Sequence, residues 1–201
     1  MLKQLAICVG LVCAGTVAWA DAKSDCAQGQ DQDRRIKGCT QYIQLNPPDK
    51  KDLAIAHHNR AAAYLSKGDG NSAITDYTKA IEIDSKYASA YTNRSAAYFK
   101  QGDYERAIAD AKKAIEIEPS AIRYNNRGAA YREKGAYGEA IADFTKAIAM
   151  EPTANRYVTR AVAYEKKGDR DNAIADFRRA QAKDPNNQGS KEGLKRLGAS
   201  P

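Results

Sequence analysis

The sequence contains little proline, glycine or cysteine for its length of 201 residues. Six Pro and 14 Gly exclude a collagen-like chain and a disordered chain rich in these two residues. Four Cys are too few for a protein held together mainly by disulfide bonds. Hydrophobic residues make up 43% and charged residues 28% of the chain, a balance typical of a soluble globular protein.

Residues arranged for catalysis or metal binding are also missing. The two histidines, His57 and His58, are adjacent, so on a helix they point about 100° apart and are not placed to bind one metal ion together. No Gly-rich phosphate-binding loop follows a strand pattern. We therefore expect a non-enzymatic protein without a metal ion or cofactor, in which His57 belongs to the core.

The N-terminus has the pattern of a secretory signal peptide. Lys3 precedes an uncharged apolar run over residues 5–17, and residues 18–20 place alanines at a cleavage site. The run is shorter than the roughly 20 residues that cross a membrane, which disfavours the alternative of an uncleaved anchor. We predict a signal peptide over residues 1–20, cleavage after Ala20, a periplasmic or secreted protein, and no transmembrane segment after cleavage.

An Ala-Ile pair recurs along the chain with nearly constant spacing. The four pairs begin at Ala73, Ala107, Ala140 and Ala173, which are 34, 33 and 33 residues apart. A fixed period of this length is typical of an array of helical repeats. Other residues keep the same register, namely Tyr64, Tyr98, Tyr131 and Tyr164, then Gly68, Gly102, Gly135 and Gly168, and finally Pro119, Pro152 and Pro185.

One repeat contains the signals for two helices. In the second repeat, residues 91, 94, 95 and 98 are three or four positions apart and form one stripe of a first helix. Gly102 provides the left-handed residue that ends this helix, and Asp103 caps the next one. An apolar stripe follows over residues 107–115, until Pro119 stops the second helix. Each repeat is thus a helix-turn-helix pair that must stack on its neighbours.

The pattern resembles the tetratricopeptide repeat (TPR), whose small residues, tyrosines, alanines and prolines recur in register from Ala54 to Pro185. The family's first-helix leucine is replaced by Arg60, Arg94, Arg127 and Arg160, as in the Asn-Arg-Gly variant of bacterial members. The resemblance implies an all-α, right-handed α-solenoid. We expect a truncated repeat or cap over residues 21–53, four repeats over 54–87, 88–120, 121–153 and 154–185, and a capping helix over 186–201.

Both ends of the array are expected to be capped. In the register of the repeats, Cys26 and Cys39 occupy places that face each other across a helix pair, so we predict a disulfide bond between them. A redox-active pair is the alternative, although there is no Cys-x-x-Cys motif. At the other end, Leu194 and Leu197 of a short amphipathic helix cover the last apolar face. Ala136 replaces the capping aspartate of the third repeat, so the second helix there should fray first.

The resemblance further implies that the first helices line a concave, peptide-binding groove. The expected groove residues are Asn59, Ala62, Leu65, Asn93, Ala96, Phe99, Asn126, Ala129, Arg132 and Thr159. Asparagine amides both donate and accept, so a row of them suits the backbone of an extended peptide. The alternative is that Leu65 and Phe99 only pack on neighbouring helices. His58 and Thr92 stand where the family's chaperone-tail clamp needs lysine, so that specificity is not predicted.

Charged residues permit two further interpretations. The four arginines named above are matched in register by Asp76, Asp110, Asp143 and Asp176. We expect a ladder of Arg–Asp pairs that fixes the stacking of the helices, the alternative being arginines that bind an acidic ligand. Basic and acidic residues balance between Asp21 and Ser120, so the net positive charge of the mature chain lies beyond Ser120. The clusters there either bind an anionic partner or are a solvated surface.

These features together predict an exported scaffold or adaptor that binds a protein or peptide ligand in the groove of its first helices. An assembly or folding helper for envelope proteins is an alternative that uses the same groove. A binder of an anionic envelope component is an alternative that uses the basic C-terminal third. Nucleic acid is not an expected partner, because no basic stretch is interleaved with aromatic residues.

Overall fold

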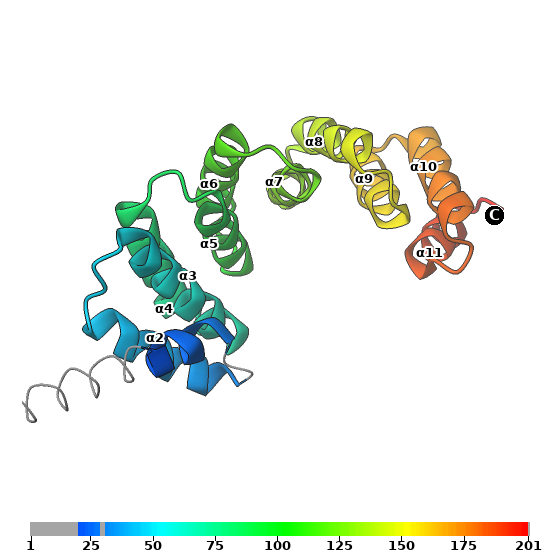
Figure 1. Ribbon diagram of the computed structural model, residues 1–201. Coiled ribbons are helices and arrows are strands. Elements are labelled where there is room, and N and C mark those ends of the chain that lie inside the picture. The colour runs from blue at the N-terminus through cyan, green and yellow to red at the C-terminus, as the bar shows by residue number, and fades with distance from the viewer. Residues whose placement is uncertain (1–19, 29–30, 201) are drawn as a thin grey trace, which may run out of the picture. The chain divides into compact units, whose positions relative to one another are not determined.

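The computed structural model describes residues 20–28 and 31–200, and all regular structure in these ranges is helical (Figure 1). The predicted all-α fold is therefore confirmed. The chain divides into two compact units, the first ending at Ala97 and the second beginning at Tyr98. Of the predicted signal peptide, residues 1–19 lie outside the described residues.

The first unit contains a helical segment over residues 20–28, then α2 (Gln32–Gln44), α3 (Lys50–Ser66), α4 (Gly70–Ile83) and most of α5 (Ala88–Lys100). The second unit contains the end of α5, then α6 (Tyr104–Ile117), α7 (Ala121–Glu133), α8 (Tyr137–Met150), α9 (Ala154–Lys167), α10 (Arg170–Lys183) and α11 (Gln188–Arg196). Helices pack in hairpins, α3 on α4, α7 on α8 and α9 on α10. Because Asp49 caps α3, this helix begins at Lys50, ahead of the expected repeat start at Ala54.

The turn inside each hairpin contains a glycine, which an aspartate follows in three of the four repeats. The glycines that end the first helices have φ values between 78° and 87°, and they are Gly68, Gly102, Gly135 and Gly168. Side chains cap three of the second helices by accepting a hydrogen bond from the backbone N–H three residues on, and they are Asp69, Asp103 and Asp169. Ala136 makes no such bond at the start of α8. The fraying predicted for α8 rests on this missing cap.

The hairpin cores pack small residues against aromatic rings. Tyr77 is buried against Ala61 in the first unit, and Phe177 is buried against Ala161 in the second. At Gly128 an added Cβ would lie 2.8 Å from the Phe144 ring. The helices of this hairpin therefore approach closely because Gly128 has no side chain.

Buried arginine–aspartate pairs join the two helices of each hairpin. Nε and Nη2 of Arg60 donate to Asp76 at 2.6 and 2.8 Å. Arg127 holds Asp143 at 2.7 and 2.8 Å, and Arg160 holds Asp176 at 2.6 and 2.9 Å. The predicted pairs are thus confirmed for the three repeats that lie within one unit; Arg94 and Asp110 are divided between the two units. This geometry favours a structural role for the arginines over binding of an acidic ligand.

Two of these arginines also reach the preceding hairpin. Nη1 of Arg60 donates to the Thr40 hydroxyl of α2 at 3.0 Å, and Nη1 of Arg160 donates to the Thr145 hydroxyl of α8 at 2.9 Å. These two guanidinium groups therefore bind the second helix of their own hairpin and that of the previous one. Tyr157 and Tyr164 flank Arg160 with ring centres at 6.0 and 5.9 Å, which explains why tyrosines recur on both sides of the arginine.

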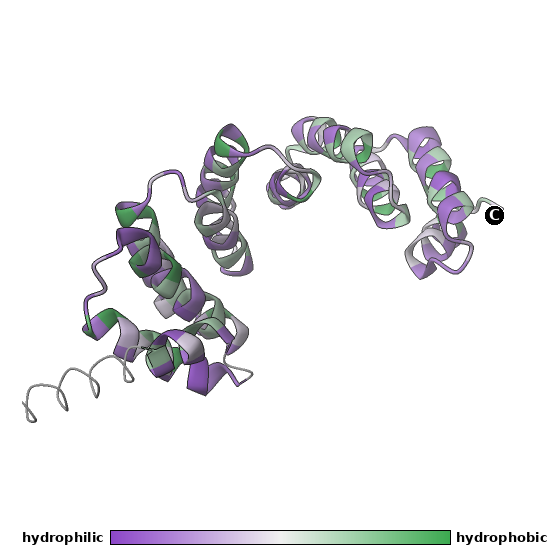
Figure 2. Ribbon diagram, in the orientation of Figure 1, coloured by the Kyte–Doolittle hydropathy of each residue, from purple (hydrophilic) through white to green (hydrophobic). Residues whose placement is uncertain are grey.

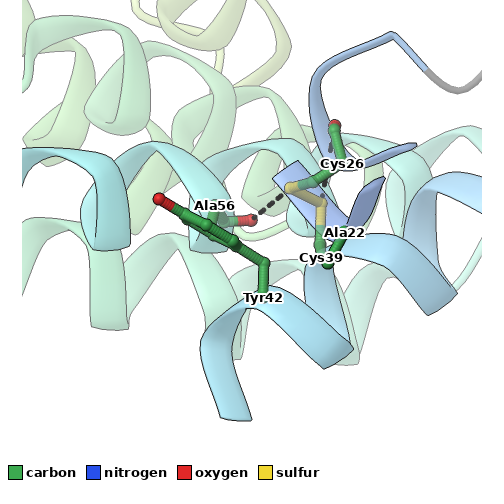
Figure 3. Packing of buried hydrophobic residues seen from close by; sticks show 5 residues of the cluster. All are labelled: Ala22, Cys26, Cys39, Tyr42 and Ala56. Carbon is green, nitrogen blue, oxygen red and sulfur yellow. Dashed lines mark hydrogen bonds between the residues drawn. A yellow bond between two sulfur atoms is a disulfide. The ribbon is translucent and has the colours of Figure 1, made fainter. Parts of the chain in front are cut away.

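A disulfide bond joins the N-terminal segment to α2, as predicted. Cys26 and Cys39 are bonded and buried, and Figure 3 shows them packed with Ala22, Tyr42 and Ala56. A Cβ added at Gly38 would overlap the backbone of the neighbouring segment, so the two helices are also in close contact. The first unit thus begins with a cross-linked cap whose apolar cluster is small.

The helix α11 covers the other end of the array. Leu194 is buried in the cluster around Phe177, and Leu197 packs on the same cluster, as expected for a capping helix. A Cβ added at Gly193 would overlap the Phe177 ring. Gly193 lies 33 residues after Arg160, so the register place of the paired arginine is held by glycine in α11. No second helix follows α11 in the described chain, and there is no aspartate for an arginine to bind.

Candidate functional site

The predicted groove residues all lie on first helices of the hairpins and are half-buried. We call this set the first-helix face. In the first unit it comprises residues 59, 62 and 65 of α3 and residues 93 and 96 of α5. In the second unit it comprises Phe99, residues 126, 129 and 132 of α7, and Thr159 of α9. The two parts are described separately below.

In the first unit, a histidine lies between the two predicted groove asparagines. The amide nitrogen of Asn93 donates to Nε2 of His58 at 3.0 Å. Nδ1 of the same ring lies 3.4 Å from Oδ1 of Asn59, which accepts. Because an amide nitrogen only donates and an amide oxygen only accepts, this arrangement requires neutral imidazole with its hydrogen on Nδ1. Burial lowers the pKa of His58, which favours the same neutral form.

Aromatic rings complete this cluster. The His58 ring centre lies 5.5 Å from that of Tyr77 and 5.0 Å from that of Tyr87. Burial raises the pKa of Tyr77 to about 12, so its phenol stays protonated. Asn59 also donates to the Cys26 carbonyl oxygen at 3.4 Å. The asparagines of the first unit are therefore engaged in bonds within the protein, a role that sequence reasoning missed because His58 occurs in one repeat alone.

Other residues of the first-helix face contact the hairpin cores. Leu65 packs on the cluster around Tyr77, which supports the packing alternative for this residue. Ala129 packs on the cluster around Phe144, and Phe99 lies 5.6 Å from Tyr104 between ring centres. Arg132 pairs with its neighbour Glu133 at 2.9 Å. Each of these four residues therefore makes at least one contact within the protein.

In the second unit, the face is hollowed near the start of its first helices. A hollow of about 430 Å³ lies between the first turns of α7 and α9 and the loop before α9. Its wall includes the amide of Asn125 and the hydroxyl of Thr159, which lie 3.4 Å apart. The Thr159 hydroxyl also donates to the Arg156 carbonyl oxygen at 2.9 Å. Thr159 was predicted for the groove, whereas Asn125 was not.

The apolar member of this hollow is Ile122, with 59% of its surface exposed. The corresponding places hold Ile55 in the first repeat and the polar residues Ser89, Asn155 and Gln188 elsewhere. Ile55 is half-buried whereas Ile122 is exposed, so the residue type alone does not identify Ile122. The hollow therefore combines one exposed aliphatic side chain with amide and hydroxyl groups.

The basic clusters of the C-terminal third make bonds within the second unit. Arg178 donates to the Ser200 carbonyl oxygen at 3.2 Å, and Arg179 binds Asp176 at 2.7 Å. Arg196 of α11 binds Glu165 of α9 with two bonds of 2.6 and 2.7 Å. These bonds engage arginine side chains within the protein, so fewer of them are available to an anionic partner than the sequence suggests.

Within residues 20–28 and 31–200, no three His, Cys, Asp or Glu side chains are grouped to hold a metal ion. His57, for its part, bonds Asp76 through Nδ1 at 2.8 Å. In the same ranges no helix has both the length and the apolar character needed to cross a membrane.

Helical hairpins of constant length, with a Gly-Asp turn, small residues against aromatic rings and closing prolines, define a tetratricopeptide repeat protein. The chain belongs to this family, and its residues 49–200 match the family described as the ETO1 C-terminal domain. No curated protein sequence matches the chain.

Solved structures share the fold. A structure of MamA protein is 23% identical with a TM-score of 0.74, over 93% of this chain and 97% of that one. A thermophilic TPR protein of Thermus thermophilus is 22% identical with a TM-score of 0.64, over 91% and 98%. YrrB, described as a TPR protein with an unusual peptide-binding site, is 16% identical with a TM-score of 0.74, over 86% and 88%.

Proposed function

We propose that this protein is an exported, non-enzymatic scaffold that binds a protein or peptide on its first-helix face. The observation that carries the proposal is the hollow of about 430 Å³ in the second unit. Amide and hydroxyl groups beside an exposed aliphatic side chain suit a peptide, since they bond its main chain while an apolar side chain packs beside them. The peptide-binding site described for YrrB, a protein of the same fold, is in keeping with this proposal.

Export is supported by the chemistry of the N-terminal cap. A buried disulfide bond between Cys26 and Cys39 is stable in an oxidising compartment and rare in reducing ones. The signal-like pattern of residues 1–20 points to the same compartment. We therefore propose a periplasmic or secreted protein. Mass spectrometry of the protein is expected to find Asp21 at the N-terminus and no free thiol. A different N-terminus would contradict export, and two free thiols in the chain that begins at Asp21 would contradict the disulfide bond.

The test of binding uses a displayed library of random peptides and the whole chain as bait. Peptides that are enriched are then measured by calorimetry against an Asn126→Ala/Thr159→Ala variant of the first-helix face, in which Thr159 lines the hollow. We expect the affinity to fall about tenfold, because an amide and a hydroxyl partner are lost together. Thr75→Ala, an exposed position on the second helix α4, is the matched control and should leave the affinity unchanged.

Melting temperatures separate a loss of binding from a loss of fold in these variants. A double variant that keeps its melting temperature and its full affinity for every selected peptide would exclude the first-helix face as the site. An envelope folding helper would use the same face, and it is distinguished by selected peptides that share no sequence pattern.

A further inference from the structure

Large apolar side chains that are exposed lie at or close to the loops that follow second helices. In the described residues the large hydrophobic side chains that are exposed are Leu45, Ile117, Ile122 and Met150. Leu45, Ile117 and Met150 share one register place, the end of a second helix, and Figure 2 shows the apolar end of α6 where the loop to α7 begins. Ile122 lies in the first turn of α7, directly after that loop.

Three of these side chains belong to the second unit, and we call Ile117, Ile122 and Met150 the apolar edge. Ile117 and Ile122 flank the loop of residues 118–120. Glu151, which follows Met150 directly, lines the same hollow as Ile122. Ile122 and Glu151 thus meet at the hollow, and Ile117 and Met150 are the residues next to the two inter-helix loops.

The acidic and basic side chains at these two loops differ in how exposed they are. Arg123 binds the Glu118 carboxylate at 2.9 Å, and Arg156 binds the Glu151 carboxylate at 2.8 Å. In both pairs the arginine side chain is nearly buried, 11% and 13% exposed, whereas the glutamates are 66% and 60% exposed.

Each arginine also donates to the carbonyl oxygen of its own glutamate, at 2.7 Å from Arg123 and 3.0 Å from Arg156. The guanidinium groups are thus held beneath the loops, and the surface presents carboxylates. A carboxylate has about four acceptor positions, so each glutamate can accept further bonds while it keeps its arginine. The apolar edge is rimmed by negative charge, although the second unit as a whole is basic.

We propose that the apolar edge docks a protein segment in which an aliphatic side chain is next to a lysine or arginine. The aliphatic side chain packs on Ile122 in the hollow and on Met150, which directly precedes Glu151. The cation binds Glu151, which lines the hollow, or Glu118 of the preceding loop. An acidic segment or an anionic lipid surface is disfavoured, because it meets exposed carboxylates. This inference rests on the proposed peptide-binding function and specifies the chemistry of its ligand.

The Met150 methyl group can be observed separately by NMR, because Met1 and Met150 are the two methionines of the chain. The whole chain, labelled with carbon-13 at the methionine methyl groups, is titrated with the synthetic peptide Gly-Ser-Leu-Lys-Leu-Ser-Gly. We expect the Met150 methyl signal to shift and saturate. A peptide with glutamate in place of its lysine should bind at least fivefold more weakly, because its carboxylate faces those of the rim.

Two substitutions and a matched control assign the site. Ile122→Ser is expected to weaken the Leu-Lys-Leu peptide about tenfold by removing the apolar contact. Glu151→Gln should weaken it up to about fivefold, as for an exposed ion pair, and reduce the preference for lysine. Gln188→Ser changes the same register place in α11, outside the hollow, and should leave the affinity unchanged.

The proposal is overturned if millimolar peptide does not move the Met150 signal, if lysine and glutamate peptides bind equally, or if vesicles of anionic lipid move the signal and the peptides do not. Each of these results leaves the proposed function standing when the library-selected peptides still distinguish the first-helix variant from Thr75→Ala. If no peptide binds in either experiment, both proposals fail together. Circular dichroism verifies that each variant is folded.

Discussion

The two units build the same hairpin but use their first helices differently. In the first unit, His58 bonds both Asn59 and Asn93 and stacks on tyrosine rings. In the second unit, the register place of His58 is held by Asn125, which lines an open hollow beside Ile122. The shared residues of the repeat therefore determine the scaffold, whereas two or three variable places on the first helix determine whether its face is closed by internal bonds or open to a ligand.

The largest effect is expected where the two units are most alike, at the buried arginine–aspartate pairs. Asp143→Ala should destabilise the second unit by about 3–5 kcal/mol, because it leaves Arg127 buried without a carboxylate. Asp76→Ala should have a similar effect on the first unit. Hydrogen exchange resolved by segment measures each unit, with the exposed Glu139→Ala as the control. A loss below about 1 kcal/mol in both units would show that the pairs do not hold the hairpins.

Removal of the disulfide bond should destabilise the first unit and leave the stability of the second unit unchanged. The Cys26→Ala/Cys39→Ala variant is expected to lose about 3 kcal/mol in the first unit, since the bond closes a loop in the unfolded chain. The second unit contains no cysteine and should keep its exchange rates. Reduction of the unaltered protein with dithiothreitol supplies the same comparison without a substitution. Equal losses in both units would mean that they unfold together.

A pair of glycines in one hairpin tests how tightly the second unit is packed. Gly128→Ala should destabilise it by about 1–3 kcal/mol, because the new methyl group meets the Phe144 ring. Gly138→Ala on the partner helix α8 meets no atom within 4 Å and should be neutral or stabilising by up to about 1 kcal/mol. Urea unfolding of the two variants measures the difference. Equal stabilities would contradict the close approach at Gly128.

The smallest effect is a pH dependence of stability, which is expected in the first unit because His58 lies there. Burial lowers the pKa of His58, so the unfolded chain takes up a proton at a higher pH than the folded chain does. The contribution of His58 to stability is therefore complete above its ordinary pKa of about 6.5 and is lost as the pH falls through the lowered value. Hydrogen exchange between pH 7 and 5 should show this loss in the first unit, and His58→Gln should abolish it. An unchanged pH dependence in that variant would exclude His58 as the cause.

Features that follow the register of the repeats were predictable from the sequence, and features that depend on the conformation of individual side chains were not. The hairpins, their Gly-Asp turns and the Arg60–Asp76 type of pair recur along the chain, so each occurrence supports the others. The disulfide bond was predictable because Cys26 and Cys39 fall on register places already known to face each other. The bonds of His58 to two asparagines were not, because hydrogen bonds between side chains depend on rotamers that no spacing specifies.

The same distinction applies to the candidate site. Thr159 was predicted by its register, and the structure places it at the hollow. Ile122 was missed because its exposure does not follow from its register place, at which Ile55 of the first repeat is half-buried. Exposure of Glu118 and burial of its partner Arg123 also depend on the path of the loop, which a one-dimensional pattern does not contain.

The glycine in α11 has a consequence for how such arrays grow. Gly193 stands in place of the guanidinium that would otherwise need a carboxylate from a following helix, so α11 packs on the Phe177 ring without such a partner. A duplicated copy of residues 154–186 inserted ahead of α11 would therefore make the contacts that α9 and α10 already make with the helices before and after them. Whole repeats can be added to this protein in this way without a new helix–helix interface, as long as α11 is retained.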